Sequence, residues 1–321
     1  MDKKISIVVP CYNEQECAPI FMQEVLEQTK CIDAQIEVIF VDDGSSDDTL
    51  NVIRSLSNEY TQANYIALSR NFGKEAALLA GLEAATGNFV VVMDADLQHP
   101  PALLPQMYEA LTTQGYDSAC ARRVDRIGES RMRSFFARRF YRTLSKMSNM
   151  HMQQGATDYR MMTRQFVNAV LSLSERNRFT KGIFGWVGFN TKWIEYKNAP
   201  RAAGKTKWSF WKLWLYSMDG IISFSAKPLA ISSFFGILFC LASFIFAIVI
   251  AIGWLLHGNP VQGWASTITI ILFASGIQLF SIGILGQYVA KSYLETKGRP
   301  IYIIKENSKL DESLQNNSKE N

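Results

Sequence analysis

Two aspartates, Asp94 and Asp96, stand one residue apart directly after an apolar run at 89–93. Carboxylate oxygens are hard donors that suit Mg²⁺ or Mn²⁺, and such an ion keeps coordination positions open for a diphosphate. Gln98 and His99 follow closely, which favours a binding loop over the alternative, a strand end that merely carries acidic residues. The spacing therefore predicts a divalent-cation site where a strand opens into a loop.

A second acidic pair, Asp42 and Asp43, precedes Gly44 and Ser45. One interpretation is structural, because Ser45 or Asp47 can cap a following helix and Gly44 can supply a turn. The other is functional, because a carboxylate at a strand end accepts hydrogen bonds from a base or a ribose. Capping does not need both aspartates, so the sequence favours a nucleotide-binding role for this pair.

An anion site is predicted where Arg70 and Lys74 flank Gly73. The backbone N–H groups at the start of a helix bind phosphate, and the two cations add positive charge beside it. The alternative is a solvated loop without a ligand. The residue types favour phosphate binding at this point of the chain.

The residues of these three predicted sites lie in the first 120 residues, where short segments rich in β-branched side chains alternate with segments of helical pattern. We expect strands at 5–9, 36–41, 65–68 and 89–93, and helices at 14–29, 47–59 and 74–85. Alternation of this kind gives an α/β fold, a mainly parallel sheet with helices on both faces. Ligands bind beyond the carboxyl ends of such strands, which is where the polar residues described above fall.

Basic residues gather after this region, although the net charge of +4 over 321 residues is modest and does not suggest nucleic acid as a partner. Nine Lys or Arg side chains fall between 122 and 146, against two acidic ones, Asp125 and Glu129. Apolar residues recur there at helical spacing, which predicts a basic amphipathic helix on an anionic membrane rather than an ordinary solvated helix. Trp208, Trp211 and Trp214 fit an aromatic belt at a membrane interface.

Two apolar segments, 229–256 and 264–290, each exceed the ~20 residues that span a bilayer core. The linker between them has no Lys or Arg, whereas Lys227 and Lys291 flank the pair. The positive-inside rule then predicts a transmembrane hairpin with both flanks cytoplasmic, the alternative being two buried helices of a soluble core. We expect a domain at 1–227, two spans within 228–291 and a tail at 292–321, which from residue 305 has the composition of a disordered segment.

The cysteines and the N-terminus indicate the cellular compartment in which the N-terminal domain lies. The five cysteines are odd in number and form no CxxC or metal-ligand spacing, which is typical of a reducing environment. The first apolar run, 5–10, is too brief for the core of a signal peptide. We therefore expect the N-terminal domain to stay on the side of the membrane where it was made.

A set of ordered motifs carries a family resemblance that covers residues 5 to about 305. They are VVPCYNE at 8–14, VDDGSSD at 41–47, RNFGKE at 70–75, DADLQHP at 94–100, GATDYR at 155–160, ERNRF at 175–179, GKTKWS at 204–209 and YLETKGRP at 293–300. With these motifs the chain resembles the inverting family 2 glycosyltransferases. Within them it resembles the polyprenyl-phosphate hexosyltransferases of the bactoprenol glucosyltransferase type, which are related to dolichol-phosphate mannose synthase. One departure is at Lys207 or its neighbours, where some relatives carry arginine, so which basic residue touches the acceptor phosphate stays open.

The resemblance implies a GT-A, Rossmann-like domain for the nucleotide-sugar, followed by amphipathic interface helices and a two-helix transmembrane hairpin. It assigns the nucleotide-sugar to Pro10, Tyr12, Asn13, Glu14, Asp42, Asp43, Arg70, Gly73, Lys74 and Asp94. It assigns a Mg²⁺ or Mn²⁺ ion to Asp94, Asp96 and Gln98, and the acceptor phosphate to Arg122, Arg131, Arg133, Arg201, Lys205 and Lys207. Asp96 and Asp158 are the candidate catalytic residues. Asp158 would orient the acceptor or a basic side chain, the alternative being an inert ion pair with Arg160.

The implied reaction moves a hexose from a UDP-sugar to undecaprenyl phosphate or another polyprenyl phosphate with inversion, for modification of a cell-envelope glycan. UDP-glucose is the first expected donor and UDP-N-acetylglucosamine the second. A non-catalytic nucleotide-binding membrane scaffold is the alternative from another class of protein, whereas a processive polysaccharide synthase is disfavoured because the chain has no QxxRW motif. The resemblance also implies a homo-oligomer, a tetramer, in the bacterial cytoplasmic membrane, with the catalytic domain and both termini in the cytoplasm.

Overall fold

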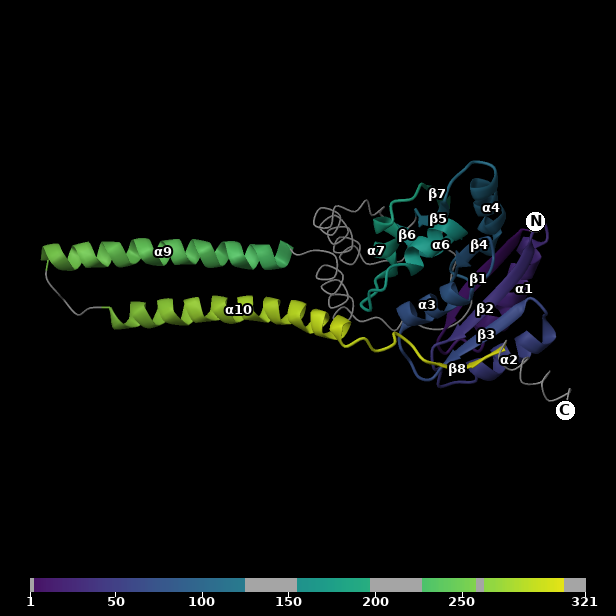
Figure 1. Ribbon diagram of the computed structural model, residues 1–321, viewed down its shortest axis with the longest axis horizontal. Coiled ribbons are helices and arrows are strands. Elements are labelled where there is room, and N and C mark those ends of the chain that lie inside the picture. Colours follow the sequence, from purple (N-terminus) through teal and green to yellow (C-terminus); the bar gives the residue numbers. More distant parts are fainter. Residues whose placement is uncertain (1–2, 125–154, 197–226, 258–262, 309–321) are drawn as a thin grey trace. The chain divides into compact units, whose positions relative to one another are not determined.

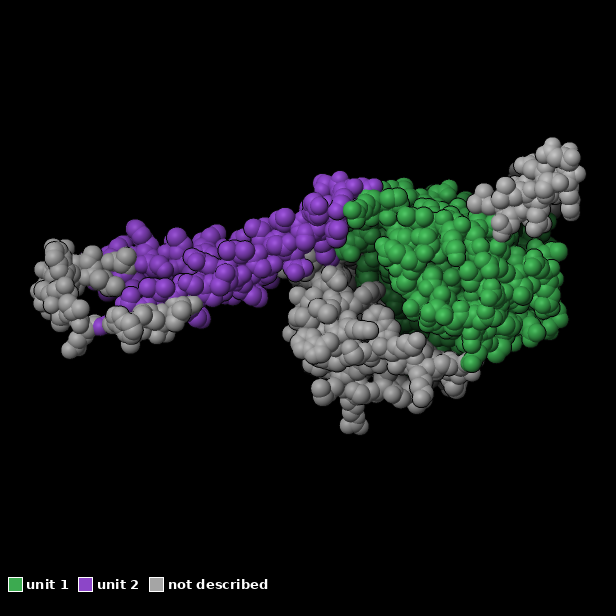
Figure 2. Space-filling model, turned by 90° about the horizontal axis from the view of Figure 1, so that it is seen from below, with its two compact units in different colours: residues 1–213, 299–321 green, residues 214–298 purple. Residues whose placement is uncertain are grey.

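The computed structural model describes residues 3–124, 155–196, 227–257 and 263–308 (Figure 1). The chain divides into two compact units, residues 1–213 with 299–321 and residues 214–298 (Figure 2). The larger unit carries a β-sheet with its helices, and the smaller unit carries two long helices. The domain boundaries expected from the sequence, after 227 and after 291, stay predictions.

Four parallel strands come from the alternating part of the sequence. They are β1 (Lys4–Cys11), β2 (Gln35–Asp42), β3 (Ala63–Leu68) and β4 (Phe89–Val92), and β1 lies between β2 and β4. Each strand begins and ends within two residues of its predicted bounds. The prediction of a parallel sheet is confirmed for this part of the chain.

Four further strands make the sheet mixed. They are β5 (Ser118–Arg123), β6 (Ala156–Thr163), β7 (Thr191–Tyr196) and β8 (Ile304–Asn307), and the strand order is β7-β5-β6-β4-β1-β2-β3-β8. β6 runs antiparallel to both β4 and β5, and β8 runs antiparallel to β3. These antiparallel pairings were not predicted, because they join segments far apart in the sequence and leave no local pattern.

Helices cover both faces of the sheet (Figure 1). The described ones are α1 (Cys17–Thr29), α2 (Thr49–Glu59), α3 (Lys74–Ala84), α4 (Leu104–Thr112) after the 3₁₀ turn η1 (Pro101–Leu103), α6 (Arg164–Leu171) and α7 (Thr180–Trp186). α1 begins later than expected because the Glu14 carbonyl accepts the N–H groups of Cys17 and Ala18 in a preceding turn, both at 3.0 Å. α2 also begins later, because Asp47 Oδ1 accepts the Thr49 N–H at 3.1 Å.

Strands β1 to β4 are mostly apolar because both faces of the sheet are buried there. Ile7 and Val9 of β1 pack in the same core cluster as Phe21 of α1. Val8, which points to the opposite face, lies against Gly81 of α3. All three β1 residues are fully buried, so the strand that precedes the first polar loop is held from both sides.

The C-terminal strand β8 corrects one expectation. The sequence predicted disorder from residue 305 onward, but residues 304–307 form an edge strand and the Ser69 N–H donates to the Ile303 carbonyl at 2.9 Å. Arg54 of α2 holds Glu306 with its Nη2, 2.5 and 2.7 Å from the two carboxylate oxygens. The prediction was wrong here because a polar composition does not reveal a free sheet edge that can supply backbone hydrogen bonds. Residues 309–321 lie outside the described part of the chain.

The smaller unit contains α9 (Lys227–His257) and α10 (Trp264–Thr296). Both are long and apolar enough to cross a membrane, over Leu229–Phe246 in α9 and Phe273–Thr296 in α10, and neither stretch is buried within the protein. The two helices lie side by side (Figure 1), and the rings of Phe239 and Phe273 are 5.6 Å apart. Exposed apolar helices disfavour the alternative of a buried soluble pair.

Gly44 offers a test of how tightly the loops after β2 and β3 are packed. Its φ is +64°, and an added Cβ would lie 2.4 Å from the Arg70 carbonyl carbon and 2.5 Å from the Asn71 nitrogen. We expect Gly44→Ala to lower the free energy of unfolding by about 3 kcal/mol, because backbone strain and overlap add. Gly115→Ala is the matched control, since its φ is +73° with open space around it, and it should cost about 1 kcal/mol. Equal shifts of the thermal unfolding temperature would contradict the close approach of these loops.

Candidate active site

The predicted site residues gather beyond the carboxyl ends of β1, β2 and β4. The Asp43 N–H donates to the Cys11 carbonyl at 2.9 Å, and the Met93 N–H donates to the Val8 carbonyl at 3.1 Å. These hydrogen bonds continue the parallel pairing past the strand ends. The three loops that follow are therefore held next to one another at one edge of the sheet.

The loop after β1 is fastened to the loop after β2. The Asn13 N–H donates to Ser45 Oγ at 3.0 Å, and the Ser46 N–H donates to Asn13 Oδ1 at 2.9 Å. The Glu14 N–H donates to Thr49 Oγ1 at 2.8 Å. Asn13 adopts a left-handed conformation with φ of +58°, which asparagine tolerates better than most residues.

Within this fastened loop the ring of Tyr12 is 46% exposed, and Pro10, at the end of β1, is half-buried. The side chain of Tyr12 thus faces solvent while the backbone on either side is fixed. Such a ring offers a flat face for stacking. The predicted nucleotide contacts of Pro10, Tyr12, Asn13 and Glu14 stay predictions, and the structure places all four in or beside one loop.

Asp42 and Asp43 are both buried and both have structural partners. The Ser45 N–H donates to the Asp42 carboxylate at 3.3 Å, whereas the N–H groups of Phe72 and Gly73 donate to Asp43 at 2.7 and 2.9 Å. Burial raises the pKa of both carboxyl groups, and these hydrogen bonds oppose the rise. Each carboxylate thus closes a different turn, a structural role besides capping, and nucleotide binding by the pair stays a prediction.

Asp43 also explains how the predicted anion site is built. Its hydrogen bonds hold Gly73, whose φ is +99°, at the N-terminus of α3, so that Lys74 is the first residue of the helix. Arg70 is exposed, and its guanidinium lies 4.1 Å from the centre of the Phe72 ring. Arg70, Gly73 and Lys74 thus lie on one short segment, and phosphate binding by them stays a prediction.

The loop after β4 carries the two aspartates of the predicted cation site. The Gln98 N–H donates to Asp96 Oδ1 at 3.1 Å, and Leu97 between them has a φ of +54°. This tight turn points the residues after Asp96 back along the sheet edge. Asp94 keeps 28% of its side chain exposed, so its carboxylate is accessible to a ligand.

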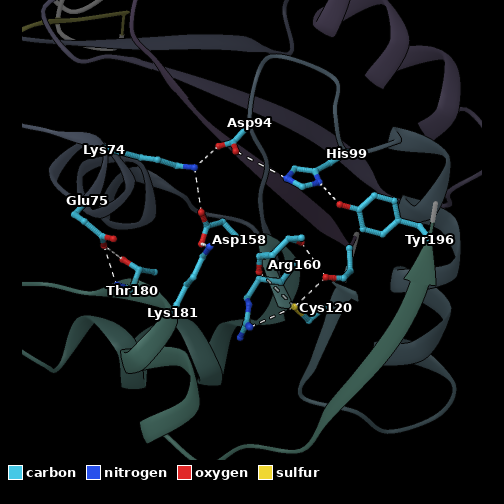
Figure 3. A network of polar contacts seen from close by, with 12 residues as sticks. Lys74, Glu75, Asp94, His99, Cys120, Asp158, Arg160, Thr180, Lys181 and Tyr196 are labelled. Atoms are coloured by element: carbon cyan, nitrogen blue, oxygen red, sulfur yellow. Dashed lines mark hydrogen bonds and ion pairs between the residues drawn. The ribbon is translucent and has the colours of Figure 1, made fainter. Parts of the chain in front are cut away.

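A chain of ion pairs connects Asp94 to Asp158 of β6 (Figure 3). Lys74 Nζ lies 2.6 Å from Asp94 Oδ1 and 3.1 Å from Asp158 Oδ2. Lys181 Nζ of α7 lies 3.7 Å from Asp158 Oδ1. Negative and positive side chains thus alternate from Asp94 in the loop after β4, through Lys74 of α3 and Asp158 of β6, to Lys181 of α7.

The antiparallel register explains why these two carboxylates meet. Val92 of β4 pairs with Arg160 of β6, and Asp94 and Asp158 each lie two residues beyond this last pair, at the same end of the two strands. Burial alone would raise the pKa of Asp158, but Lys181 and Lys74 outweigh it and hold the pKa well below the usual range. Burial would likewise lower the pKa of Lys74, but Asp94 and Asp158 raise it well above its usual value. Both groups are therefore charged near neutral pH.

His99 and Tyr196 extend the chain on the other side of Asp94. His99 Nε2 is 3.9 Å from Asp94 Oδ2, and His99 Nδ1 is hydrogen-bonded to the Tyr196 hydroxyl at 2.7 Å. Burial lowers the pKa of His99, although Asp94 opposes this, and burial raises the pKa of Tyr196 to about 12. A neutral imidazole is therefore held between a carboxylate and a phenol.

The structure contradicts the suggested ion pair between Asp158 and Arg160. The Arg160 guanidinium is buried, lies 4.1 Å from the centre of the Phe184 ring and donates to Cys120 Sγ at 3.4 Å (Figure 3). Asp158 instead pairs with two lysines, as described above. Alternate residues of a strand share a face, but here the side chains turn to different partners.

Some residues of this site carried no signal in the sequence. Lys181 and Tyr196 lie outside the motif residues to which the sequence gave a role, and only the fold brings Lys181 to Asp158 and Tyr196 to His99. Glu75 stood inside a motif without an assigned role, and it accepts the Thr180 N–H at 2.9 Å and the Thr180 hydroxyl. This contact fixes the start of α7 and with it the position of Lys181.

Most of the predicted acceptor residues lie outside the described part of the chain, namely Arg131, Arg133, Arg201, Lys205 and Lys207. Arg122, at the end of β5, is described, and its Nη1 lies 3.4 Å from Glu195 Oε1. Its side chain is 33% exposed. Acceptor binding by these residues stays a prediction.

With this geometry established, comparison with known proteins identifies the family. Residues 6–171 match the family described as Glycosyl transferase family 2. The chain belongs to this family. The protein CsbB of Bacillus subtilis (strain 168) is 43% identical over 302 residues, which are 94% of this chain and 91% of that one. The bactoprenol glucosyl transferase of Shigella phage SfX is 40% identical over 302 residues, 94% of this chain and 99% of that one.

Among solved structures, one similar to this glycosyltransferase is glucosyl-3-phosphoglycerate synthase from Mycobacterium tuberculosis in complex with Mn²⁺, uridine-diphosphate-glucose and phosphoglyceric acid. It is 18% identical, with a TM-score of 0.49, and the match covers 69% of this chain and 78% of that one. The mixed sheet with helices on both faces is the GT-A arrangement of a family 2 glycosyltransferase.

The acidic loop of this glycosyltransferase fits a divalent ion that a substrate helps to bind. Among the described residues, no group of three or more His, Cys, Asp or Glu side chains is arranged to hold a metal alone. Mg²⁺ in phosphate-handling sites is held by one or two carboxylates plus the phosphates of the substrate. Asp94 and Asp96 are two carboxylates of this kind on one loop, and ion binding by them and Gln98 stays a prediction.

Tyr196 provides a test of the chain of contacts around Asp94. Tyr196→Phe removes the hydroxyl that fixes the His99 ring, and we expect turnover to fall by about tenfold, because outer partners of a ligand carboxylate orient it. Tyr108→Phe is the control, since it removes one exposed hydrogen bond to the Asp33 carbonyl and should leave turnover unchanged. Steady-state rates of sugar transfer by both purified variants check this, and equal rates would contradict a role for Tyr196 in the site.

Proposed function

We propose that this family 2 glycosyltransferase moves a hexose from a UDP-sugar to a polyprenyl phosphate at a membrane surface. The observation that carries the proposal is the presence in one chain of a charged carboxylate site at the sheet edge and two exposed, membrane-length apolar helices. Relatives named bactoprenol glucosyl transferases, 40% identical over 302 residues, support glycosyl transfer to a prenyl phosphate.

The donor nucleotide is assigned to the loops after β1 and β2. The exposed Tyr12 ring can stack on a base, and Asn13 and Glu14 lie beside it on a fixed backbone. Asp42 and Asp43 support these loops through their hydrogen bonds. The diphosphate is assigned to Arg70, Gly73 and Lys74, because the N-terminus of α3 and two cations attract an anion.

A Mg²⁺ or Mn²⁺ ion is assigned to Asp94, Asp96 and Gln98. When bound, the ion would neutralise negative charge on the departing nucleoside diphosphate. The accessible carboxylate of Asp94 and the turn that holds Asp96 support this assignment. His99 and Tyr196 would keep the Asp94 carboxylate in place from the other side.

The chemistry replaces one bond at the anomeric carbon by another. The bond to the diphosphate oxygen breaks, UDP leaves, and an oxygen of the lipid phosphate forms the new bond from the opposite face, which inverts the configuration. A phosphate monoester has a second pKa of about 6, so the acceptor is already anionic near neutral pH and needs no strong base. Asp158 fits such a reaction as an orienting group, because its two lysine partners keep it ionised and paired.

The acceptor phosphate is assigned to basic side chains near the end of β5 and in the two segments that precede the apolar helices. They are Arg122, Arg131, Arg133, Arg201, Lys205 and Lys207. Basic side chains bind phosphate through charge-assisted hydrogen bonds and can align it with the sugar. The two apolar helices support a site beside a bilayer, where a polyprenyl chain resides.

The location follows from the same features. The linker between α9 and α10 has no Lys or Arg, whereas both flanks are basic, which supports a hairpin with the catalytic domain and both termini in the cytoplasm of a bacterial cell. A homo-oligomer, a tetramer, is part of the proposal through the family resemblance alone. UDP-N-acetylglucosamine is the second candidate donor.

Product analysis tests the reaction. The purified full chain is incubated with Mn²⁺, undecaprenyl phosphate and UDP-glucose, UDP-N-acetylglucosamine or UDP-galactose in turn, and the lipid product is weighed by mass spectrometry. We expect a hexose adduct from UDP-glucose. Hydrolysis of a donor without a lipid adduct would contradict the acceptor, whereas binding without any turnover would support the scaffold alternative.

The metal assignment has its own test. Asp96→Asn keeps the volume of the side chain but removes a carboxylate, so we expect transfer to fall by at least about a thousandfold while the thermal unfolding temperature is kept. Asp33→Asn, which changes an exposed carboxylate distant in the sequence from this loop, is the control and should transfer at the normal rate. Chelation of divalent ions should abolish transfer by the unchanged protein. Near-normal turnover of Asp96→Asn with Mn²⁺ present would refute the assignment.

A further inference from the structure

The ammonium group of Lys74 lies against the carboxylate of Asp94, which the proposed function assigns to a divalent ion. Lys74 Nζ lies 2.6 Å from Asp94 Oδ1, a charge-assisted contact on a carboxylate assigned to the ion. The same nitrogen lies 3.1 Å from Asp158 Oδ2 (Figure 3). One flexible side chain therefore bridges the carboxylate assigned to the ion and a second carboxylate assigned to orienting the acceptor.

We propose that Lys74 is an internal cation that neutralises Asp94 until the donor arrives, and that it is released onto Asp158 when the divalent ion binds. The proposal rests on the metal assignment made under the proposed function. It adds an ordered event to that assignment, because the ion and the ammonium would compete for the same carboxylate.

Electrostatics makes the competition unavoidable. A monovalent and a divalent cation that share one carboxylate oxygen repel each other strongly at such a short separation. The divalent ion therefore binds Asp94 only as Lys74 moves away. In the absence of a nucleotide this requirement weakens the affinity of the protein for the ion.

Asp158 lowers the free-energy cost of releasing Lys74 from Asp94. Lys74 already contacts Asp158, so leaving Asp94 costs one of its two ion pairs and keeps the other. The Lys74 side chain is 44% exposed, which leaves room for a small rotation. Lys181, 3.7 Å from the other oxygen of Asp158, keeps that carboxylate ionised throughout.

The consequence is that the donor controls metal capture. A nucleoside diphosphate brings phosphate oxygens that ligate the ion and also gives the start of α3, where Lys74 stands, a new anion to contact. Both effects favour the state in which Lys74 has left Asp94. The ion is thus held firmly only when the diphosphate it serves is present.

Binding of Mn²⁺ alone tests the proposal without reference to activity. The purified full chain is titrated with Mn²⁺ in the absence of nucleotide, and free Mn²⁺ is measured by electron paramagnetic resonance. We expect Lys74→Met to bind Mn²⁺ about tenfold more tightly than the unchanged protein, a coupling of ordinary size for two linked sites. Lys74→Arg, which keeps the charge, should bind as weakly as the unchanged protein.

Two further variants separate this competition from the general effect of charge. Lys181→Met also removes a positive charge beside Asp158 but leaves the contact of Lys74 with Asp94 in place, so it should change Mn²⁺ affinity by less than about twofold, within the effect of a screened neighbouring charge. Asp158→Asn leaves Lys74 with Asp94 as its one carboxylate partner in this cluster, so it should weaken Mn²⁺ binding by about fivefold. That weakening should disappear in the double variant Lys74→Met, Asp158→Asn, whereas independent charge effects would simply add.

The outcomes distinguish this proposal from the metal assignment. If Lys74→Met binds Mn²⁺ no more tightly than the unchanged protein, or not detectably, the competition is refuted. If, in addition, Asp94→Asn and Asp96→Asn as single variants each bind Mn²⁺ as tightly as the unchanged protein does, the metal assignment itself fails. If those two variants lose Mn²⁺ binding while Lys74→Met gains no Mn²⁺ affinity, the metal assignment stands and the proposed role of Lys74 is refuted.

Discussion

The site depends on the balance of charge between two carboxylates that the sheet brings together, Asp94 and Asp158. Two ionised carboxylates in a partly buried edge repel each other and lose hydration, so they need cations between or beside them. Lys74 and Lys181 supply these cations from two different helices. The position of α3 and α7 relative to β4 and β6 is thus an electrostatic requirement as well as a packing result.

The antiparallel strand β6 is what creates this requirement. Parallel strands linked by helices bring only loop residues such as Asp43 and Asp94 to one edge. β6 lies beside β4 in the opposite direction, so Asp158, which lies in the strand itself, comes to the end of β4 that the loop residue Asp94 follows. A mixed sheet therefore contributes to the site from within a strand, where the backbone is rigid. Rigid placement suits a residue that orients charge.

The sequence predicted the first four strands and three helices closely, because each strand is a mostly apolar segment and each helix is bounded by polar turns. It also placed Asp42, Asp43, Asp94 and Asp96 at the correct edge. It did not predict β6 beside β4 or β8 beside β3, because those pairings depend on contacts between distant segments. Lys181 and Tyr196 were missed for the same reason, since each comes close to the other site residues only when the sheet has formed.

Asp42 and Asp43 illustrate why residue type alone does not assign a role. Both stand where a nucleotide is expected, yet both carboxylates are buried and accept backbone N–H groups of Ser45, Phe72 and Gly73. Removing a carboxylate of this kind would leave buried donors without acceptors and would disturb two loops at once. Any loss of donor binding in such a variant would then be indirect, because Asp43 holds the turn from which Lys74 reaches Asp94. A carboxylate that supports a turn and a lysine that pairs with the acidic loop are in this way parts of one arrangement, because the turn held by Asp43 is the one from which α3 begins.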